Sequence, residues 1–245
     1  MRPSWKFVFA AFLIGLSALL YAVHYAIFRD ARHIFLYLLG DIAFVPINVL
    51  FVTLILEHLL EARQKQQRLA KITMVIDAFF SETGNPFLRS LDVIRRDNPQ
   101  IEDNVRISDS WIAKDFAHAR ACWNKLDPTL VLRSIDLRGL RAFLQTHRPF
   151  LLGLLENPTL LEHDAATDML WALFHLTEEL LARSHLEKLS ESDAQHLAGD
   201  IRRAYHRVGM CWIDHMRHLK KDYPYLFSLA ARLNPFLPDA RAELT

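Results

Sequence analysis

Two apolar stretches near the amino end, separated by only five residues, constrain the fold of this chain more than any other feature. The first runs from Phe7 to Phe28 and the second from Ile34 to Leu56. A helix needs about 20 apolar residues to cross the hydrocarbon core of a bilayer, and each stretch meets that length. Because the connection is so short, we expect an antiparallel transmembrane hairpin with spans at 7–28 and 34–56.

The first apolar stretch has a second interpretation, as a cleaved secretory signal peptide. The apolar part of such a peptide is about 7 to 15 residues long and is followed by a cleavage site of small residues. The stretch from Phe7 to Phe28 is longer, and no convincing small-x-small site follows it. The sequence therefore favours a span that is retained in the mature protein.

The basic residues that flank the spans indicate the orientation of the hairpin. Lysine and arginine are enriched on the cytoplasmic side of membrane helices. The amino end carries Arg2 and Lys6, and the turn carries only Arg29 and Arg32. Four more basic residues follow the second span: Arg63, Lys65, Arg68 and Lys71. We therefore expect a multi-pass protein with both termini in the cytoplasm.

Polar side chains interrupt both spans and share one face of each helix. In the second span, Asp41 and Asn48 are seven residues apart, which places them on one face. In the first span, Ser17, Tyr21 and His24 follow the same helical spacing. An antiparallel hairpin brings Tyr21 level with Asp41, so we expect the two polar faces to meet. A carboxyl that faced lipid instead would cost about 2.5 to 3.5 kcal/mol.

Pro46 is expected to kink the second span. Its ring nitrogen carries no hydrogen, so it cannot donate to the carbonyl of Ile42 one turn earlier. The freed carbonyl needs another donor, which a neighbouring helix, a Ser or Thr side chain or water can supply. The sequence therefore predicts a helix kink at Pro46.

Three interpretations of the intramembrane polar residues stay open on the sequence alone. The first is an internal clasp that fixes how the two helices align. The second is an oligomeric pore or proton path lined by Asp41, Asn48 and His24. The third is pairing with another membrane protein. The sequence contains no selectivity-filter pattern and no row of gating arginines, which argues against the pore.

The residues after the second span continue a helical pattern into a cytosolic part of the chain. No glycine or proline occurs from Glu57 to Ser81, and apolar residues return at helical spacing from Leu69 onward. The turn signal Gly84-Asn85-Pro86 is expected to end this helix. We therefore divide the chain into a transmembrane hairpin at 1–57, a connecting cytosolic helix at 58–82 and a cytosolic domain at 83–245.

The cytosolic part has the composition and spacing of a series of helices. Leu, Ala, Arg and Glu are abundant, whereas alternating β-branched residues are nearly absent. The longest patterned stretches are Leu160–Leu181 and Ser192–Lys221, and Pro149 is expected to separate helices at Leu137–Thr146 and Pro149–Leu155. The sequence therefore predicts an all-α fold class, a transmembrane helical hairpin followed by an α-helical cytosolic domain.

The two long stretches carry the best metal-ligand candidates among the twelve histidines of the chain. In the first, His175 and Glu179 lie close to one face, and Glu178 lies beside them. In the second, His215 and His218 lie one turn apart. Carboxylate-bridged bundles use Glu-x-x-His, whereas the order here is His175-x-x-Glu178. We therefore assign no metal and keep His175, Glu178, His215 and His218 only as candidates.

Motifs of other functional classes are absent from the sequence. It has no Gly-x-Ser-x-Gly elbow and no phosphate-binding glycine loop. The 29 basic and 28 acidic residues balance, so no overall field attracts nucleic acid. Cys122 and Cys211 suggest no disulfide framework, and Cys211 is expected to be a packed thiol. We therefore predict no catalytic residue, no cofactor and no nucleic-acid partner.

Three stretches resemble a family of uncharacterised bacterial two-transmembrane-helix inner-membrane proteins with a helical cytosolic domain. They are LYLLGDIAFVPINVLFVTLILEHLLEAR, MVIDAFFSE and, near the carboxyl end, YPYLFSLAARLNPF. Because the stretches lie toward both ends, the resemblance covers most of the chain. It implies a bacterial inner (cytoplasmic) membrane as the location, and it implies no activity, ligand or catalytic residue.

The function expected from the sequence is an anchored interaction or sensory module without catalytic activity. Its expected partners are the lipid bilayer, an unidentified protein and further copies of the chain, joined through the membrane helices and the stalk. Two alternatives remain. One is an oligomeric channel or transporter subunit that uses the intramembrane polar residues, and the other is a membrane-tethered metal-dependent enzyme.

Overall fold

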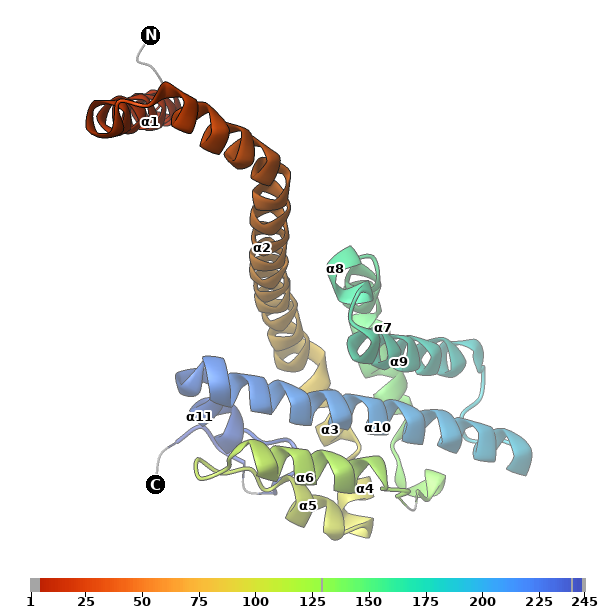
Figure 1. Cartoon of the computed structure of the whole chain (residues 1–245). Coiled ribbons are helices and arrows are strands. Elements are labelled where there is room, and N and C mark those ends of the chain that lie inside the picture. The colour runs from red at the N-terminus through yellow and green to blue at the C-terminus, as the bar shows by residue number, and fades with distance from the viewer. Residues whose placement is uncertain (1–4, 129, 239, 244–245) are drawn as a thin grey trace. The chain divides into compact units, whose positions relative to one another are not determined.

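The structure, a computed structural model, describes residues 5–128, 130–238 and 240–243, with side chains at all of these except 33, 62 and 64–71. Every regular element in these ranges is a helix (Figure 1), which confirms the predicted all-α fold class. Two long apolar helices come first, and a helical domain follows. The elements are α1 (Trp5–Phe28), α2 (Ala31–Phe79), η1 (Phe80–Gly84), α3 (Asn85–Ser90), α4 (Asp92–Asp97), α5 (Gln100–Val105), α6 (Ala113–Asn124), η2 (Leu132–Ser134), α7 (Leu137–Leu155), α8 (Pro158–Leu161), α9 (Asp164–Ala182), α10 (Glu191–Asp222) and α11 (Pro224–Arg232).

The chain divides into two compact units, Met1–Lys65 and Gln66–Thr245. A tight turn joins α1 to α2 in the first unit. Arg29 adopts a left-handed backbone conformation with φ of 48°, and its amide donates to the carbonyl of Tyr25 at 2.8 Å. Asp30 then accepts a hydrogen bond at 2.9 Å from the amide of Arg32, in the first turn of α2. These two bonds end one helix and begin the next within three residues.

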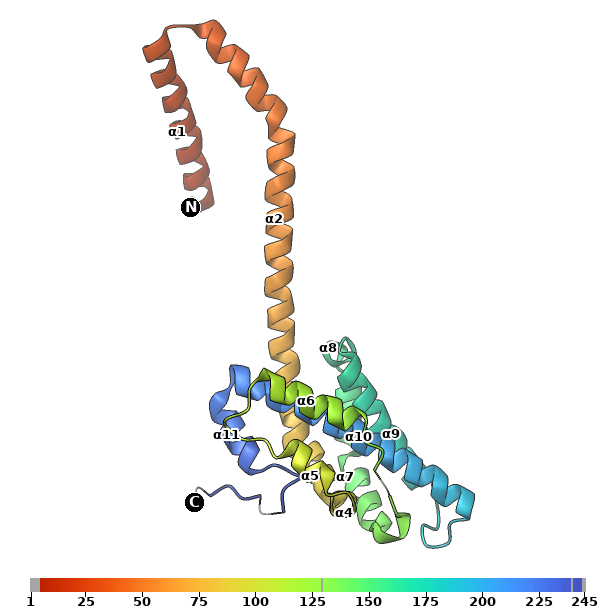
Figure 2. The same ribbon diagram turned by 60° about the horizontal axis from the view of Figure 1, so that its bottom comes forward.

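Two helical segments of the first unit are long and apolar enough to cross a membrane. They are Trp5–Phe28 and Ile34–Glu61, and none of their residues is buried within the protein. Helix α2 continues through Pro46 without ending, and its ribbon bends in the amino-terminal third (Figure 2). The neighbouring backbone therefore accommodates the missing amide hydrogen of Pro46 without breaking the helix.

Helix α10 is the central element of the second unit (Figure 1). Helices α6 and α9 both pack along it, α7 packs on α9, and α11 lies against its carboxyl-terminal end. The apolar positions of α10 recur every three or four residues, from Leu197 through Ile201, Ala204 and Val208 to Met216, and all five are buried. This spacing gives α10 a continuous apolar face for its neighbours.

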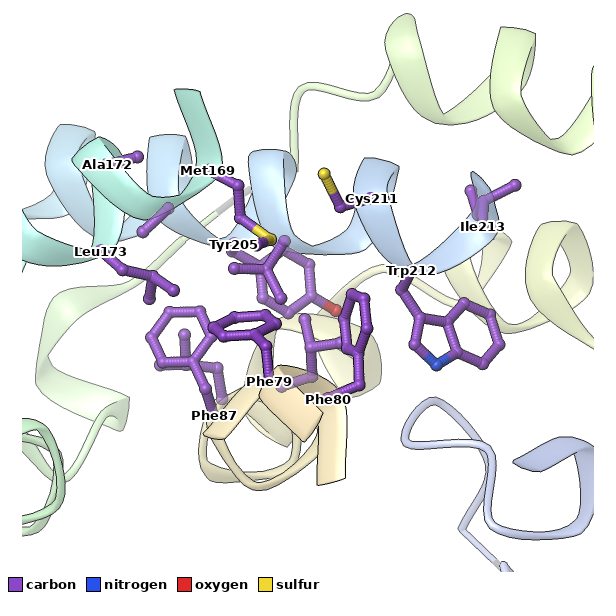
Figure 3. Close-up of a cluster of buried hydrophobic side chains, with 14 of the residues drawn as sticks. Phe79, Phe80, Phe87, Met169, Ala172, Leu173, Tyr205, Cys211, Trp212 and Ile213 are labelled. Carbon is purple, nitrogen blue, oxygen red and sulfur yellow. The ribbon is translucent and has the colours of Figure 1, made fainter. Parts of the chain in front are cut away.

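The core forms where the end of α2 meets α9 and α10. Figure 3 shows Phe79, Phe80 and Phe87 pointing from the chain around η1 toward Met169 and Leu173 of α9. All five side chains are at most 2% exposed. Two consecutive phenylalanines are buried here because α2 widens into the π-helical turn η1, rather than stopping at the Gly84-Asn85-Pro86 signal. At the predicted helix end the chain therefore changes from an α-helix to a π-helical turn and continues as α3.

Pro149 lies inside one continuous helix, so the predicted break between Leu137–Thr146 and Pro149–Leu155 is wrong. A proline in a helix interior removes one hydrogen bond and costs about 3 kcal/mol. Helix α7 nevertheless runs from Leu137 to Leu155 and buries Leu144 and Leu151 on either side of the proline. Burying one leucine side chain contributes about 1.5–3 kcal/mol. Packing against α9 therefore outweighs the local preference.

The carboxyl-terminal segment closes the core beside α10. Asn234 is fully buried, its amide nitrogen donates to the carbonyl of Val105 at 2.8 Å, and its amide oxygen accepts from the backbone of Phe236 at 3.0 Å. The Phe236 ring then packs edge-on against the rings of Trp123 and Trp212, each with centroids 5.1 Å away. One asparagine thus fixes the segment that completes an aromatic cluster.

The pairing of His206 with Trp123 predicts a loss of stability under mildly acidic conditions. The indole of Trp123 donates to the carbonyl of His206 at 3.0 Å, and the imidazole lies 3.2 Å from the carbonyl of Trp123. Burial lowers the pKa of His206 below its usual 6.5, although the Trp123 carbonyl opposes that effect. As the pH falls below about 6.5 the unfolded chain takes up a proton first, so the free energy of unfolding falls until the folded-state pKa is passed.

We therefore expect His206→Gln to flatten this part of the pH profile. Glutamine keeps a donor for the Trp123 carbonyl but does not titrate. The measurement is urea unfolding of wild type and variant at several values from pH 7.5 to pH 5. Burial also lowers the pKa of His218, so part of the slope should remain in the variant. Identical slopes in both proteins would contradict the assignment to His206.

Candidate functional site

Two histidines and two carboxylates converge where α9 approaches the beginning of α10. His175 and Glu179 are four residues apart on α9, and His196 and Asp200 are four residues apart on α10. Residues at this spacing lie on the same side of a helix, one turn apart. The connection 183–190 is short, so the helices run antiparallel and the end of α9 meets the start of α10. We call these four residues the His–carboxylate quartet.

Each carboxylate of the quartet lies between the two imidazoles. The Nε2 atom of His175 is 3.8 Å from Oε1 of Glu179 and 3.5 Å from Oδ1 of Asp200. The Nε2 atom of His196 is 3.7 Å from Oε2 of Glu179 and 3.3 Å from Oδ2 of Asp200. One potential ligand atom from each residue lies within 4.8 Å of all the others. The four side chains therefore surround a single point.

The quartet is buried at Asp200 and open to solvent at its two histidines. The side chain of Asp200 is only 1% exposed, whereas those of His175 and His196 are 45% and 57% exposed. The Oδ2 atom of Asp200 is buried and has no hydrogen-bond partner in the described part of the chain. A buried carboxylate oxygen without a donor is costly, because it has lost its water and gained nothing in return. This atom points to a group that the protein alone does not supply.

Two arginines donate hydrogen bonds to the carboxylates of the quartet. Arg203 donates to Oδ1 of Asp200 at 3.0 Å, and Arg183 donates to Oε2 of Glu179 at 2.6 Å. The hydrogen bond from Arg183 lowers the pKa of the Glu179 carboxyl, although burial opposes it. Glu179 is therefore an anion at neutral pH. Each arginine binds one oxygen of its carboxylate and so restricts the orientation of the group, while both oxygens of each carboxylate lie near an imidazole.

Arg183 also joins the two helices that carry the quartet. It follows α9 directly and makes a 2.6 Å ion pair with Asp193 in the first turn of α10. Its guanidinium additionally donates to the backbone carbonyl of Glu179 at 2.6 Å. The Asp193 and Glu179 carboxylates raise the pKa of Arg183 above its ordinary value, so this cation is permanent. The arrangement of the quartet is thus fixed by a charged link outside it.

Comparison with known proteins places the chain in a family. A family model described as "MJ1433, N-terminal helical domain" matches residues 1–60. A second one, described as "Uncharacterized protein MJ1433, C-terminal helical domain", matches residues 68–232. The chain belongs to the MJ1433 family.

One relative within the MJ1433 family is similar over nearly its whole length. It is the uncharacterized protein MJ1433 of Methanocaldococcus jannaschii, which is 40% identical over 232 residues, 95% of this chain and 93% of the relative. That organism is an archaeon, so the comparison does not support the bacterial setting implied by the resemblance. No solved structure matches the chain. The family assignment carries no activity.

Of the two metal-ligand candidates predicted on α9 of this MJ1433-family protein, His175 belongs to the quartet and Glu178 does not. His175 lies in the quartet, but its neighbour there is Glu179. Glu178 instead forms a 2.7 Å ion pair with Arg148 of α7. Adjacent residues of a helix differ by about 100° in direction, so only one of two consecutive glutamates can face α10.

His215 and His218 lie on the later half of α10 and form no quartet. His215 is buried, stacks on the ring of Phe80 with centroids 4.9 Å apart, and has Nε2 3.5 Å from Oδ1 of Asp77. The hydrogen bond from His215 lowers the pKa of Asp77, although burial opposes it. His218 pairs through Nδ1 with Asp222 at 3.1 Å. His215 therefore helps to hold the end of α2 against α10, whereas the ion pair of His218 lies within α10.

The predicted intramembrane residues lie in the first unit. Ser17, Tyr21, Asp41 and Asn48 are exposed, and His24 is half-buried with its ring 4.7 Å from that of Phe28. Their association into a clasp, a pore lining or a contact with another protein stays a prediction.

The two cysteines differ in their surroundings, which predicts different reactivities. Cys211 is buried, its thiol donates to the carbonyl of Ala165 at 3.3 Å, and burial raises its pKa to about 12. The prediction of a packed thiol is therefore confirmed. Cys122 is half-buried on α6, with its sulfur 3.5 Å from Nε2 of His118. Burial both excludes reagents from Cys211 and disfavours its reactive thiolate, so we expect Cys122 to be the more reactive residue.

A maleimide reagent should accordingly label one thiol in the folded protein and two in urea. Mass spectrometry of peptides should place the first label on Cys122. The matched variant Cys122→Ser should take up no label until it unfolds. Rapid labelling of Cys211 in the native protein would contradict its burial.

A surface hollow between α7 and the connection 183–190 has a volume of about 310 Å³. Its lining includes Arg138, Arg141, Ser184 and Glu187. Arg138 and Glu187 are in direct ion-pair contact, and Arg141 donates to the carbonyl of Arg183 at 3.1 Å. The charged groups of this hollow are thus engaged with one another or with the backbone.

Proposed function

We propose that this MJ1433-family protein is a multi-pass membrane protein that holds a non-catalytic sensory or interaction domain at the cytoplasmic face. One observation carries the proposal. Both apolar segments, Trp5–Phe28 and Ile34–Glu61, are as long as a membrane span and have none of their residues buried within the protein. A soluble protein rarely leaves apolar surface of this extent uncovered, because contact with water is unfavourable. A bilayer would cover it.

The basic residues support an orientation with both termini in the cytoplasm. Lys6 lies at the amino end of the first apolar segment, whereas four basic residues follow the second within about ten positions: Arg63, Lys65, Arg68 and Lys71. Only Arg29 and Arg32 flank the turn. Because basic residues resist translocation, this bias favours a cytoplasmic domain.

The described contacts of the cytosolic domain support a non-catalytic role. Two carboxylates on helix surfaces are held in ion pairs, Glu178 with Arg148 and Asp214 with Arg120. The buried thiol of Cys211 is held in its neutral form. An interaction or sensory module needs a stable helical scaffold, which α6, α9 and α10 provide.

Membrane extraction and topology reporters test this proposal together. The expressed full chain should remain in the membrane pellet after carbonate washing and should dissolve only in detergent. A fluorescent protein fused after Thr245 should fluoresce, and alkaline phosphatase fused there should be inactive. Phosphatase inserted between Asp30 and Ala31 is the matched control and should be active. Release by carbonate, or an active carboxyl-terminal phosphatase, would overturn the proposal.

We also propose that the membrane helices associate with further copies of the chain. Asp41 and Asn48 are exposed in the single chain, and both would be poorly solvated by lipid. A second copy can supply hydrogen-bond partners for them. Native mass spectrometry of protein released from nanodiscs should show an oligomer that Asp41→Leu weakens. A strictly monomeric wild type would contradict the association.

A further inference from the structure

We propose that His175, Glu179, His196 and Asp200 bind one divalent transition-metal ion of the Zn²⁺ class. Around a tetrahedral Zn²⁺, ligand atoms about 2.0–2.1 Å from the metal lie about 3.3–3.4 Å from one another. The four measured separations between imidazole nitrogens and carboxylate oxygens are 3.3, 3.5, 3.7 and 3.8 Å. These separations involve both oxygens of each carboxylate. One ligand atom from each residue lies within 4.8 Å of the others, so the side chains must draw together by up to about 1.4 Å to reach tetrahedral geometry.

The buried oxygen of Asp200 is an independent argument for a cation. Oδ2 of Asp200 has no hydrogen-bond donor in the described structure, although the side chain is 1% exposed. The Nε2 atom of His196 lies 3.3 Å from Oδ2, but it makes no hydrogen bond to that oxygen. A metal ion bound between these two atoms would satisfy the oxygen and use the imidazole nitrogen as a ligand.

The surrounding arginines orient the ligands without occupying the site. Arg203 binds the Oδ1 atom of Asp200, and Arg183 binds the Oε2 atom of Glu179. Metal-binding carboxylates are commonly oriented by hydrogen bonds of this kind. Each carboxylate keeps a second oxygen, Oδ2 of Asp200 or Oε1 of Glu179, within 3.8 Å of an imidazole nitrogen. The half-exposed histidines form the rim, so an ion can enter from solvent without opening of the core.

The donor set determines the class of metal. Two imidazole nitrogens with two carboxylate oxygens suit Zn²⁺ and its first-row neighbours, whereas Ca²⁺ and Mg²⁺ prefer more oxygen ligands. Four protein ligands close a tetrahedral site and leave no position for a reacting water, which is typical of structural metals. Such an ion would link the end of α9 to the start of α10.

The test measures Zn²⁺ binding by the full chain in detergent micelles, by competition with a chromophoric chelator. Wild type should bind one equivalent tightly. The double variant His175→Gln/His196→Gln should lose more than about 100-fold in affinity, beyond what loss of an outer-shell partner causes. His185→Gln changes an exposed histidine of the adjacent loop and should bind as wild type does. Circular dichroism should show that each variant keeps its helices.

Co²⁺ gives a second readout that reports geometry. Wild-type protein loaded with Co²⁺ should show the intense visible absorption of four-coordinate cobalt, and the single exposed variant His196→Gln should reduce it. No tight Zn²⁺ binding by wild type, or binding that the double variant retains, would overturn the proposal. A weak six-coordinate Co²⁺ spectrum would overturn the closed site. These readouts do not depend on membrane insertion, so they are separate from the tests of the proposed function.

Discussion

Gly209→Ala should destabilise the cytosolic domain by about 2–3 kcal/mol, although alanine favours helices more than glycine does. A Cβ atom at position 209 would lie 1.9 Å from Cζ2 and 2.5 Å from Cε2 of the Trp123 indole. The position of the indole is fixed, because its Nε1 donates to the carbonyl of His206 and its ring packs against Phe236. The added methyl group must therefore displace either the indole or α10.

Thermal melting followed by circular dichroism measures this effect. For a domain of this size, 2–3 kcal/mol corresponds to a fall in melting temperature of roughly 4–12 °C. Gly199→Ala is the matched control on the same helix, where a Cβ would meet nothing within 4 Å. That variant should be more stable than wild type by up to about 1 kcal/mol. Equal effects of the two substitutions would show that Trp123 does not approach α10 this closely.

Asn234→Asp should reduce the free energy of unfolding by about 3–5 kcal/mol at neutral pH, because it places an uncompensated charge in the core. The side chain is fully buried, and its amide nitrogen donates to the carbonyl of Val105. A carboxylate at this position would face that carbonyl oxygen and repel it. The loss should shrink as the pH is lowered, since a protonated carboxyl can donate again.

Asn124→Asp is the control for Asn234→Asp. It makes the same chemical change at an exposed position at the end of α6. Surface substitutions of this kind usually change stability by less than about 0.5 kcal/mol. Urea unfolding of both variants at pH 7.5 and pH 5 gives the comparison. A stable Asn234→Asp variant would mean that the carboxyl-terminal segment does not close the core.

The quartet shows how far the sequence leads toward a site. Sequence reasoning identified the two helices and His175, but it selected Glu178, His215 and His218 as companions. Helix α10 has 32 residues, and periodicity alone does not say which of its turns faces His175. Helical spacing alone placed His175 and Glu179 on one face. The missed signal was the matching spacing His196-x-x-x-Asp200 across a short connection, which requires antiparallel helices.

Periodicity, length and apolar content, read along the sequence, determined the all-α class, the two candidate spans and the approximate extents of α9 and α10, because these depend on near neighbours in the chain. Only the tertiary structure decided that α7 continues through Pro149 and that Glu179 rather than Glu178 faces His196. Both outcomes depend on packing between residues far apart in sequence. At Pro149 the free energy of that packing exceeds the tendency of proline to break a helix, and at Glu179 it sets which side of α9 faces α10.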